Sequence, residues 1–158
     1  MKYKLGCSSW GATTQQRIET IKLLADTGFE TIMLPAFLED PKGCEKVVQA
    51  VRDAGMTVDE IHAPFKNINR IWYDDESGEP ILKMLLDSID RCAEMGVDTM
   101  VLHESASRIG PDTSNAGLSR FRQIFTYAKE KGVRPAVENV RRTNHIARVF
   151  HEHRDLPV

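Results

Sequence analysis

The sequence lacks the features that would assign it to several specialised classes of protein. It contains only three cysteines in 158 residues, Cys7, Cys44 and Cys92, and no two of them form a CxxC pair. This spacing indicates neither a zinc knuckle nor a disulfide framework, and it favours a reduced, cytoplasmic setting. No apolar run approaches the roughly 20 residues that span a bilayer, and the first residues lack the apolar stretch of a signal peptide. We therefore expect no membrane partner.

The sequence also lacks a strong excess of charge of either sign. The formal net charge is −2 and the isoelectric point is near 6.2, which gives no general attraction to nucleic acid or anionic lipid. We therefore expect that nucleic acid is not its partner. The remaining composition, 41% hydrophobic and 28% charged, is that of an ordinary globular protein. The length allows a single domain over residues 1–158.

One pattern does recur four times along the chain: a helical stretch, then a glycine, then a short β-rich run. The glycines are Gly28, Gly55, Gly96 and Gly132. A glycine adopts the left-handed backbone that ends many helices without steric cost. The pattern predicts strands at about 3–9, 30–35, 57–63, 97–103 and 133–139. The order is therefore βαβαβαβαβα, which implies a parallel sheet with right-handed crossovers.

The predicted helices have start signals and apolar faces of helical period. Thr13 or Thr14 can cap the first helix, and Asp40 followed by proline can cap the second. A fifth helix is expected to begin near Thr143, with Ile146, Val149 and Phe150 as its buried face.

Two architectures share this order of elements, an open doubly wound sheet and a (β/α)8 barrel or a piece of one. The segment after the first strand, residues 8–14, matches neither GxGxxG nor GxxxxGK[ST]. The dinucleotide-binding and P-loop interpretations are therefore weak. A five-stranded open sheet remains compatible with the length alone.

Metal-capable side chains stand at the ends of three predicted strands. They are His62, His103 and Glu138. Any one of them alone is more often a satisfied core or surface residue than a ligand. The carboxyl ends of parallel strands meet at one edge of the sheet, so a barrel would bring all three together. Imidazole and carboxylate together suit Zn²⁺, Mn²⁺ or Fe²⁺.

Other conspicuous residues have structural interpretations as well as functional ones. Trp72 and Tyr73, in the long loop after the third strand, could form a lid over a substrate or a plug over the core. The Arg141-Arg142 pair could bind a phosphate, although a solvated cationic pair is favoured. The histidines near the last helix are expected on the surface; they are His145, His151 and His153.

The sequence resembles the xylose-isomerase-like (β/α)8 barrel superfamily, which includes sugar-phosphate isomerases and epimerases and the type-IV apurinic endonucleases. The resemblance rests on the runs IHAPF at 61–65, VLH at 101–103 and AVEN at 136–139. It implies an α/β fold made of parallel (β/α) units of a TIM-type barrel, about five of the eight.

By this resemblance, Glu138 is a metal ligand and one of two carboxylates that move a proton next to a substrate carbonyl. His62 and His103 would hold substrate oxygens, and we also place Trp10 and Asn139 among the substrate-binding residues. The implied cofactor is a divalent metal, Mn, Mg, Zn or Co, and the implied partner is a small carbohydrate or sugar phosphate. In the endonuclease branch, His62, His103 and Glu138 would all bind zinc; the acidic isoelectric point favours the sugar branch.

The chain departs from the superfamily in length. A (β/α)8 barrel usually needs about 200–250 residues, and the remaining ligands of the superfamily come from strands six to eight. We therefore expect a truncated barrel with an incomplete metal site and without full isomerase activity. A non-catalytic remnant that forms a homo-oligomer to cover its open sheet edges is a further alternative.

Overall fold

The computed structural model describes residues 3–9, 11–138 and 142–156. Within these ranges strands and helices alternate as predicted. The strands are β1 (Gly6–Ser8), β2 (Thr31–Pro35), β3 (Thr57–His62), β4 (Thr99–His103) and β5 (Arg134–Glu138). The helices are α1 (Thr14–Asp26), α2 (Pro41–Asp53), α3 (Glu79–Met95), α4 (Asn115–Lys131) and α5 (Thr143–Glu152), with short 3₁₀ helices η1 (Ile68–Trp72) and η2 (Glu76–Gly78) before α3. The first strand is shorter than its predicted range of 3–9.

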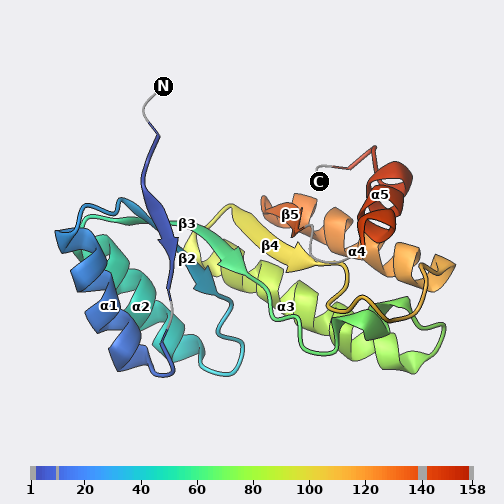
Figure 1. The fold of residues 1–158 in the computed structure, drawn as a ribbon, viewed down its shortest axis with the longest axis horizontal. Coiled ribbons are helices and arrows are strands. Elements are labelled where there is room, and N and C mark those ends of the chain that lie inside the picture. Colours follow the sequence, from blue (N-terminus) through green and yellow to red (C-terminus); the bar gives the residue numbers. More distant parts are fainter. Residues whose placement is uncertain (1–2, 10, 139–141, 157–158) are drawn as a thin grey trace.

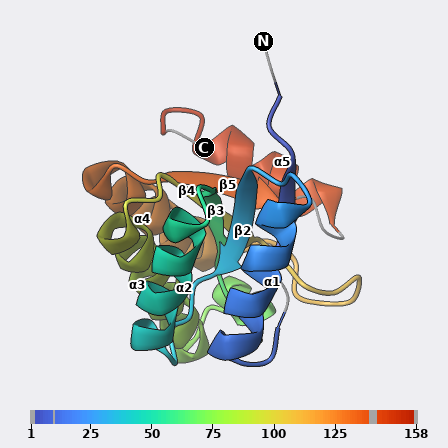
Figure 2. The ribbon, with the colours of Figure 1, turned by 90° about the vertical axis from the view of Figure 1, so that its left-hand side faces the viewer.

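The order of the strands in the sheet distinguishes the two architectures. All five strands are parallel and follow the order β1-β2-β3-β4-β5, each bonded to the next in sequence. In a doubly wound sheet the order of the strands reverses at a switch point, and the order in this sheet does not reverse. Figure 1 shows α1, α2 and α3 along one side of the strands, and Figure 2 shows α1 to α4 in an arc beside them. The fold is therefore part of a (β/α) barrel, as predicted.

The helix boundaries have the predicted chemical causes. Thr13 caps α1 in a reciprocal capping box with Gln16, and the Asp40 carboxylate accepts the backbone N–H of Gly43 at the start of α2. All four recurrent glycines have positive φ angles, +67° at Gly96 and +70° at Gly132 among them. A strand begins two or three residues after each of these glycines.

The core lies between the sheet and the helices. Alternate strand residues point to the helical side, and Ile32, Leu34, Ile61, Met100 and Leu102 are all fully buried there. The opposite side of the sheet, which we call the inner face, is hollowed over about 380 Å³ beside Met33, Glu60, Val101 and Ala136. A barrel encloses this face.

The histidines near the last helix correct one prediction. His145 and His153 are each only 1% exposed, so their expected surface location was wrong, whereas His151 is exposed. The ring nitrogens of His153 lie 2.7 and 2.9 Å from the carbonyl oxygens of Val149 and Leu118. Backbone oxygens thus make this buried imidazole tolerable. Phe150, expected in the buried face of the helix, is 38% exposed, whereas His145 and Val149 are the buried residues of the helix.

No helix in the described part of the chain is long and apolar enough to cross a membrane.

Candidate active site

Three strand ends converge at the carboxyl edge of the sheet. His62, His103 and Glu138 are the last residues of β3, β4 and β5, and β4 and β5 place His103 directly beside Glu138 in register. The Nε2 atoms of His62 and His103 lie 3.2 and 3.0 Å from Oε2 of Glu138. The ligand atoms of all three lie within 4.8 Å of one another. The structure therefore brings together the three residues that the sequence analysis grouped.

The hydrogen bonding of His62 shows that this group fits a cation. Nδ1 of His62 lies 2.7 Å from the carbonyl oxygen of Ala63, which can only accept, so Nδ1 carries the proton. In the neutral ring, Nε2 then presents a lone pair to a carboxylate oxygen of Glu138, and two acceptors face one another. A metal ion between them removes the repulsion. Histidines that bind metals usually donate their other N–H to a carbonyl in this manner.

The aromatic surroundings of His103 keep its ring close to neutral. The ring is 8% exposed and stacks on Phe65, with 4.5 Å between centroids, while His62 meets it edge-on at 5.0 Å. Burial first and the neighbouring His62 second lower the pKa of His103. A neutral imidazole is the form that binds metal or accepts a substrate hydroxyl.

Glu138 is held as a carboxylate. Its partial burial alone would raise its pKa, but its interactions with His62 and His103 outweigh that effect and lower the pKa. The side chain is 49% exposed, so a ligand can reach it from the open side. With two imidazole nitrogens and one carboxylate, the donor set matches the ligands that Zn²⁺ and Mn²⁺ take in proteins.

A cavity of about 480 Å³ opens beside this group, within the range of small-molecule sites. It runs along the carboxyl ends of the strands, from β5 to the segment after β1. Its lining includes His62, Phe65, Glu138, Ser9, Arg17 and Phe37. Trp10 and Asn139, predicted to bind substrate, lie outside the described residues, as does Arg141.

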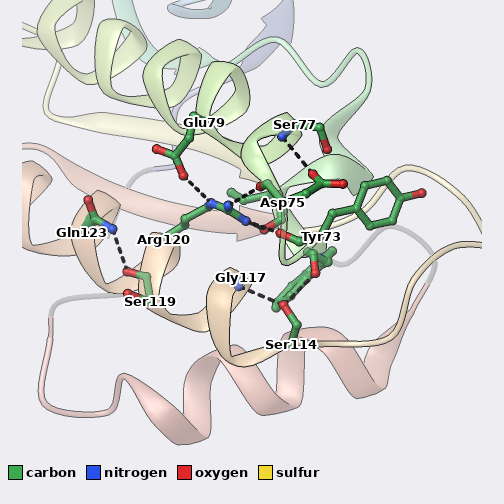
Figure 3. A network of polar contacts seen from close by, with 11 residues as sticks. Tyr73, Asp75, Ser77, Glu79, Ser114, Gly117, Ser119, Arg120 and Gln123 are labelled. Carbon is green, nitrogen blue, oxygen red and sulfur yellow. Dashed lines mark hydrogen bonds and ion pairs between the residues drawn. The ribbon is translucent and has the colours of Figure 1, made fainter.

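The loop after β3, residues 63–78, is fixed in place by a buried arginine. Arg120 of α4 is 7% exposed and donates to the carbonyl oxygens of Ile71, Tyr73 and Asp75 and to the carboxylate of Glu79. Figure 3 shows its guanidinium between Glu79 and the loop. A guanidinium suits this task because its donors lie in a rigid planar fork.

Trp72, one of the loop residues with two predicted interpretations, is a plug and not a lid. It is 2% exposed and packs against Phe121, and its indole N–H donates to the carbonyl oxygen of Glu104 at 2.7 Å. A Cβ atom at Gly117 would lie 2.2 Å from the indole, so only glycine fits there. Tyr73 is 42% exposed.

Arg142 serves the structure and not a phosphate. Its guanidinium donates to the carbonyl oxygens of Gly110 and Pro111 and to the carboxylate of Asp112. The favoured prediction of a solvated cationic pair is wrong for Arg142, whose side chain is only 14% exposed.

Arg17 and Phe37, which also line the cavity, were not predicted from the sequence. An arginine in the second turn of an amphipathic helix gives no signal that separates it from a solvated one. Phe37 has a left-handed backbone, φ +51°, which no sequence pattern around it announced.

Comparisons with known proteins agree with the fold. A family model described as xylose isomerase-like TIM barrel matches residues 21–155. No curated protein matches the chain. The chain therefore belongs to the xylose isomerase-like TIM barrel family.

Solved structures with the same fold include several sugar epimerases. A D-tagatose 3-epimerase-like protein is 18% identical, with 87% of this chain and 53% of that chain covered and a TM-score of 0.70. A D-psicose 3-epimerase, determined in the presence of D-fructose, is 14% identical, with coverage of 95% and 60% and a TM-score of 0.69. A family member from Mycobacterium smegmatis, in complex with magnesium, is 15% identical, with coverage of 89% and 54% and a TM-score of 0.62. The chain thus spans a little over half the length of these structures.

Proposed function

We propose that this chain forms the first five units of the catalytic barrel of a metal-dependent sugar or sugar-phosphate isomerase or epimerase. The observation that carries the proposal is the convergence of His62, His103 and Glu138 on one point at the carboxyl ends of three adjacent strands. Membership of the xylose isomerase-like family supports it. So does the likeness to epimerases whose structures contain D-fructose or D-allulose, and to a family member that contains magnesium.

In this proposal, Glu138 has two roles. Its carboxylate binds a divalent metal, Mn²⁺, Mg²⁺, Zn²⁺ or Co²⁺, and it moves a proton at the carbon next to the substrate carbonyl. Its lowered pKa makes it a weak base, so the carbon acid must be activated by another means. The metal, when bound, supplies that activation as a Lewis acid that polarises the carbonyl.

The two imidazoles orient the substrate in this proposal. His62 and His103 hold substrate oxygens next to Glu138. The edge-on packing of His62 against Phe65 and His103, and the stacking of Phe65 on His103, fix the directions of the two imidazoles before the substrate arrives. Fixed donors and acceptors lower the cost of reaching the transition state. Trp10 and Asn139 are proposed to contact the same substrate.

A calorimetric titration of the purified chain with Mn²⁺ and Zn²⁺ tests the proposal. We expect stoichiometric binding that is weakened by at least about 100-fold in Glu138→Gln, because the variant loses the only anionic donor of the group. Glu130→Gln is the matched control, since Glu130 is exposed on α4 and should leave the affinity unchanged. Unchanged affinity in a folded Glu138→Gln protein would contradict the assignment.

One observation favours a second candidate, a metal-dependent phosphodiesterase of the endonuclease type. Both imidazoles and the carboxylate lie close enough to bind one ion together, as the resemblance to that branch implies. The net charge of −2 does not favour a DNA backbone as partner. Incision of duplex DNA at an abasic site, falling steeply with added salt, would select this candidate over the sugar isomerase.

A further inference from the structure

The end of the cavity away from Glu138 contains a cationic side chain without an internal partner. Arg17, on α1, is the only lysine or arginine among the described residues that line the cavity. It forms no ion pair or side-chain hydrogen bond with any described residue, and its Nε atom is buried without a partner. By contrast, Arg120 and Arg142 use their donors on carbonyl and carboxylate oxygens of the protein.

The guanidinium is nevertheless held in a defined position. Its carbon lies 4.7 Å from the centroid of the Phe37 ring, so the ring supports one face by a cation–π contact. This contact occupies the face of the guanidinium and leaves the N–H groups along its edge available. Those edge donors are the ones that bind phosphate or carboxylate in a bidentate manner.

Phe37 takes an unfavourable backbone conformation at this position. Its φ angle is +51°, in the left-handed region that residues with a Cβ atom rarely adopt. The turn that follows is closed by the N–H of Asp40, which donates to the carbonyl oxygen of Phe37. Strain of this kind occurs often at ligand-binding positions, and here it belongs to the residue whose ring supports Arg17.

Ser9 provides a second, independent observation. It lines the same cavity, it is 8% exposed, and its Oγ is buried with no partner among the described residues. A buried hydroxyl without a hydrogen bond is destabilising, and a ligand oxygen in the cavity would supply the missing partner.

Part of the backbone at the start of α1 is already used within the helix cap. The N–H groups of Ala12 and Thr13 donate to the side chain of Gln16, and the N–H of Gln16 donates to Thr13. The anion site is therefore argued from side chains.

We propose that Arg17 and Ser9 form an anion subsite and that the substrate is a sugar carrying a phosphate or a carboxylate. The sugar itself rests on the proposed function, whereas the anion subsite rests on Arg17, Phe37 and Ser9 alone. The reacting carbons lie at Glu138 and the anionic group at the other end of the cavity, near Arg17. A neutral ketose leaves the guanidinium and the hydroxyl unpaired and binds less well.

The test compares three ketoses in metal-free buffer with EDTA: D-fructose, D-fructose 6-phosphate and D-fructuronate. Calorimetry should show about tenfold tighter binding, or more, for at least one anionic sugar than for D-fructose, the ratio typical of one charge-assisted bidentate contact. The phosphate and the carboxylate arms distinguish the two sources of negative charge. In Arg17→Gln the ratio should fall to about one, and in Arg17→Lys it should be intermediate because the fork is lost.

Lys22→Gln is the matched control because it removes one positive charge from the exposed side of the same helix, and the ratio should survive it. Equal binding of all three sugars, no binding of any, or a ratio that persists in Arg17→Gln would overturn the proposal. Mn²⁺ titrations of the parent protein and of Glu138→Gln separate the anion subsite from the proposed function. An anion preference in a parent protein that binds no Mn²⁺ would contradict only the metal-dependent function. Mn²⁺ binding without the preference would defeat only the anion subsite.

Discussion

At the scale of single residues, the most informative atom is Nε2 of His62. The bond between its Nδ1 and the Ala63 carbonyl leaves Nε2 as an acceptor opposite the carboxylate of Glu138. A cation between the two atoms would relieve the repulsion between these acceptors. On a surface histidine the same nitrogen would face water and would not need a cation beside it.

His145 allows a prediction at this scale. Burial first and Arg142 second lower the pKa of His145, and its ring packs edge-on against Trp72. The unfolded chain therefore takes up a proton at a higher pH than the folded protein, so this residue contributes stability above about pH 6.5 that is lost as the pH falls below that value. We expect His145→Phe to lose less stability than the parent protein between about pH 7 and pH 5.

Urea unfolding at several pH values checks this prediction. His151→Phe is the control, since His151 is exposed on the same helix, and its stability should follow that of the parent protein at every pH. Parallel pH profiles for His145→Phe and the parent protein would contradict the assigned role of burial.

Sequence patterns predicted the residues at the strand ends better than those on the last helix. His62, His103 and Glu138 could be grouped because parallel strands must end at the same edge. His145 and His153 were misplaced because hydrophobic periodicity treats histidine as polar, whereas carbonyl oxygens and an indole ring accept it in the core. Arg17 could not be recognised because its role depends on the ring of Phe37, which is twenty positions away in sequence.

At the scale of elements, the long loop after β3 is anchored to α4 instead of moving over the cavity. Arg120 holds three of its carbonyl oxygens, and Ser114 at the start of α4 donates to a fourth, that of Trp72, at 2.6 Å. The loop therefore behaves as part of the core, and changes in α4 should be transmitted to it.

We predict that Arg120→Met lowers the free energy of unfolding by about 2–4 kcal/mol, since it leaves several buried carbonyl groups without donors. Arg122→Met, on the same helix, should cost much less, because Arg122 pairs with Asp155 on the surface. Urea denaturation of both variants measures the difference, and hydrogen exchange over residues 71–79 should increase only in Arg120→Met. Similar losses of stability in both variants would contradict the anchoring role.

Elements were predictable from the sequence where the chemistry was local. Helix ends could be predicted at the capping residues Thr13 and Asp40 and at the positive-φ glycines. Threonine and aspartate favour capping hydrogen bonds, and glycine favours the left-handed backbone. The loop after β3 was not predictable, because its two 3₁₀ helices and the plug formed by Trp72 depend on Arg120, which lies about fifty residues further along. Only packing could decide between a lid and a plug.

At the scale of the whole molecule, the described strands form a curved sheet with two free edges. Among residues 3–9, 11–138 and 142–156, β1 pairs only with β2 and β5 only with β4. The inner face has apolar side chains of Met33, Val101 and Ala136 around the carboxyl group of Glu60, whose pKa is raised, chiefly by burial. Free parallel edges beside such a face favour association.

We propose that this chain, purified alone, covers its edges by forming a homo-oligomer. Sedimentation at about 100 μM, a concentration where exposed edges associate, should show a species larger than one chain. Ala136→Lys places a charge on the inner face and should shift the protein toward monomer. A strictly monomeric, cooperatively folded parent chain at that concentration would contradict this prediction.

We propose above all that Glu138, flanked by His62 and His103, binds a divalent metal at the carboxyl edge of the sheet. Anomalous diffraction from a crystal soaked in Mn²⁺ tests it most directly. We predict one strong peak within about 2.0–2.3 Å of a Glu138 oxygen and no such peak in Glu138→Gln, whereas a peak at the same distance from Nε2 of both histidines as well would favour the phosphodiesterase. A fully loaded crystal with its manganese elsewhere, or with no manganese at this edge, would contradict the account.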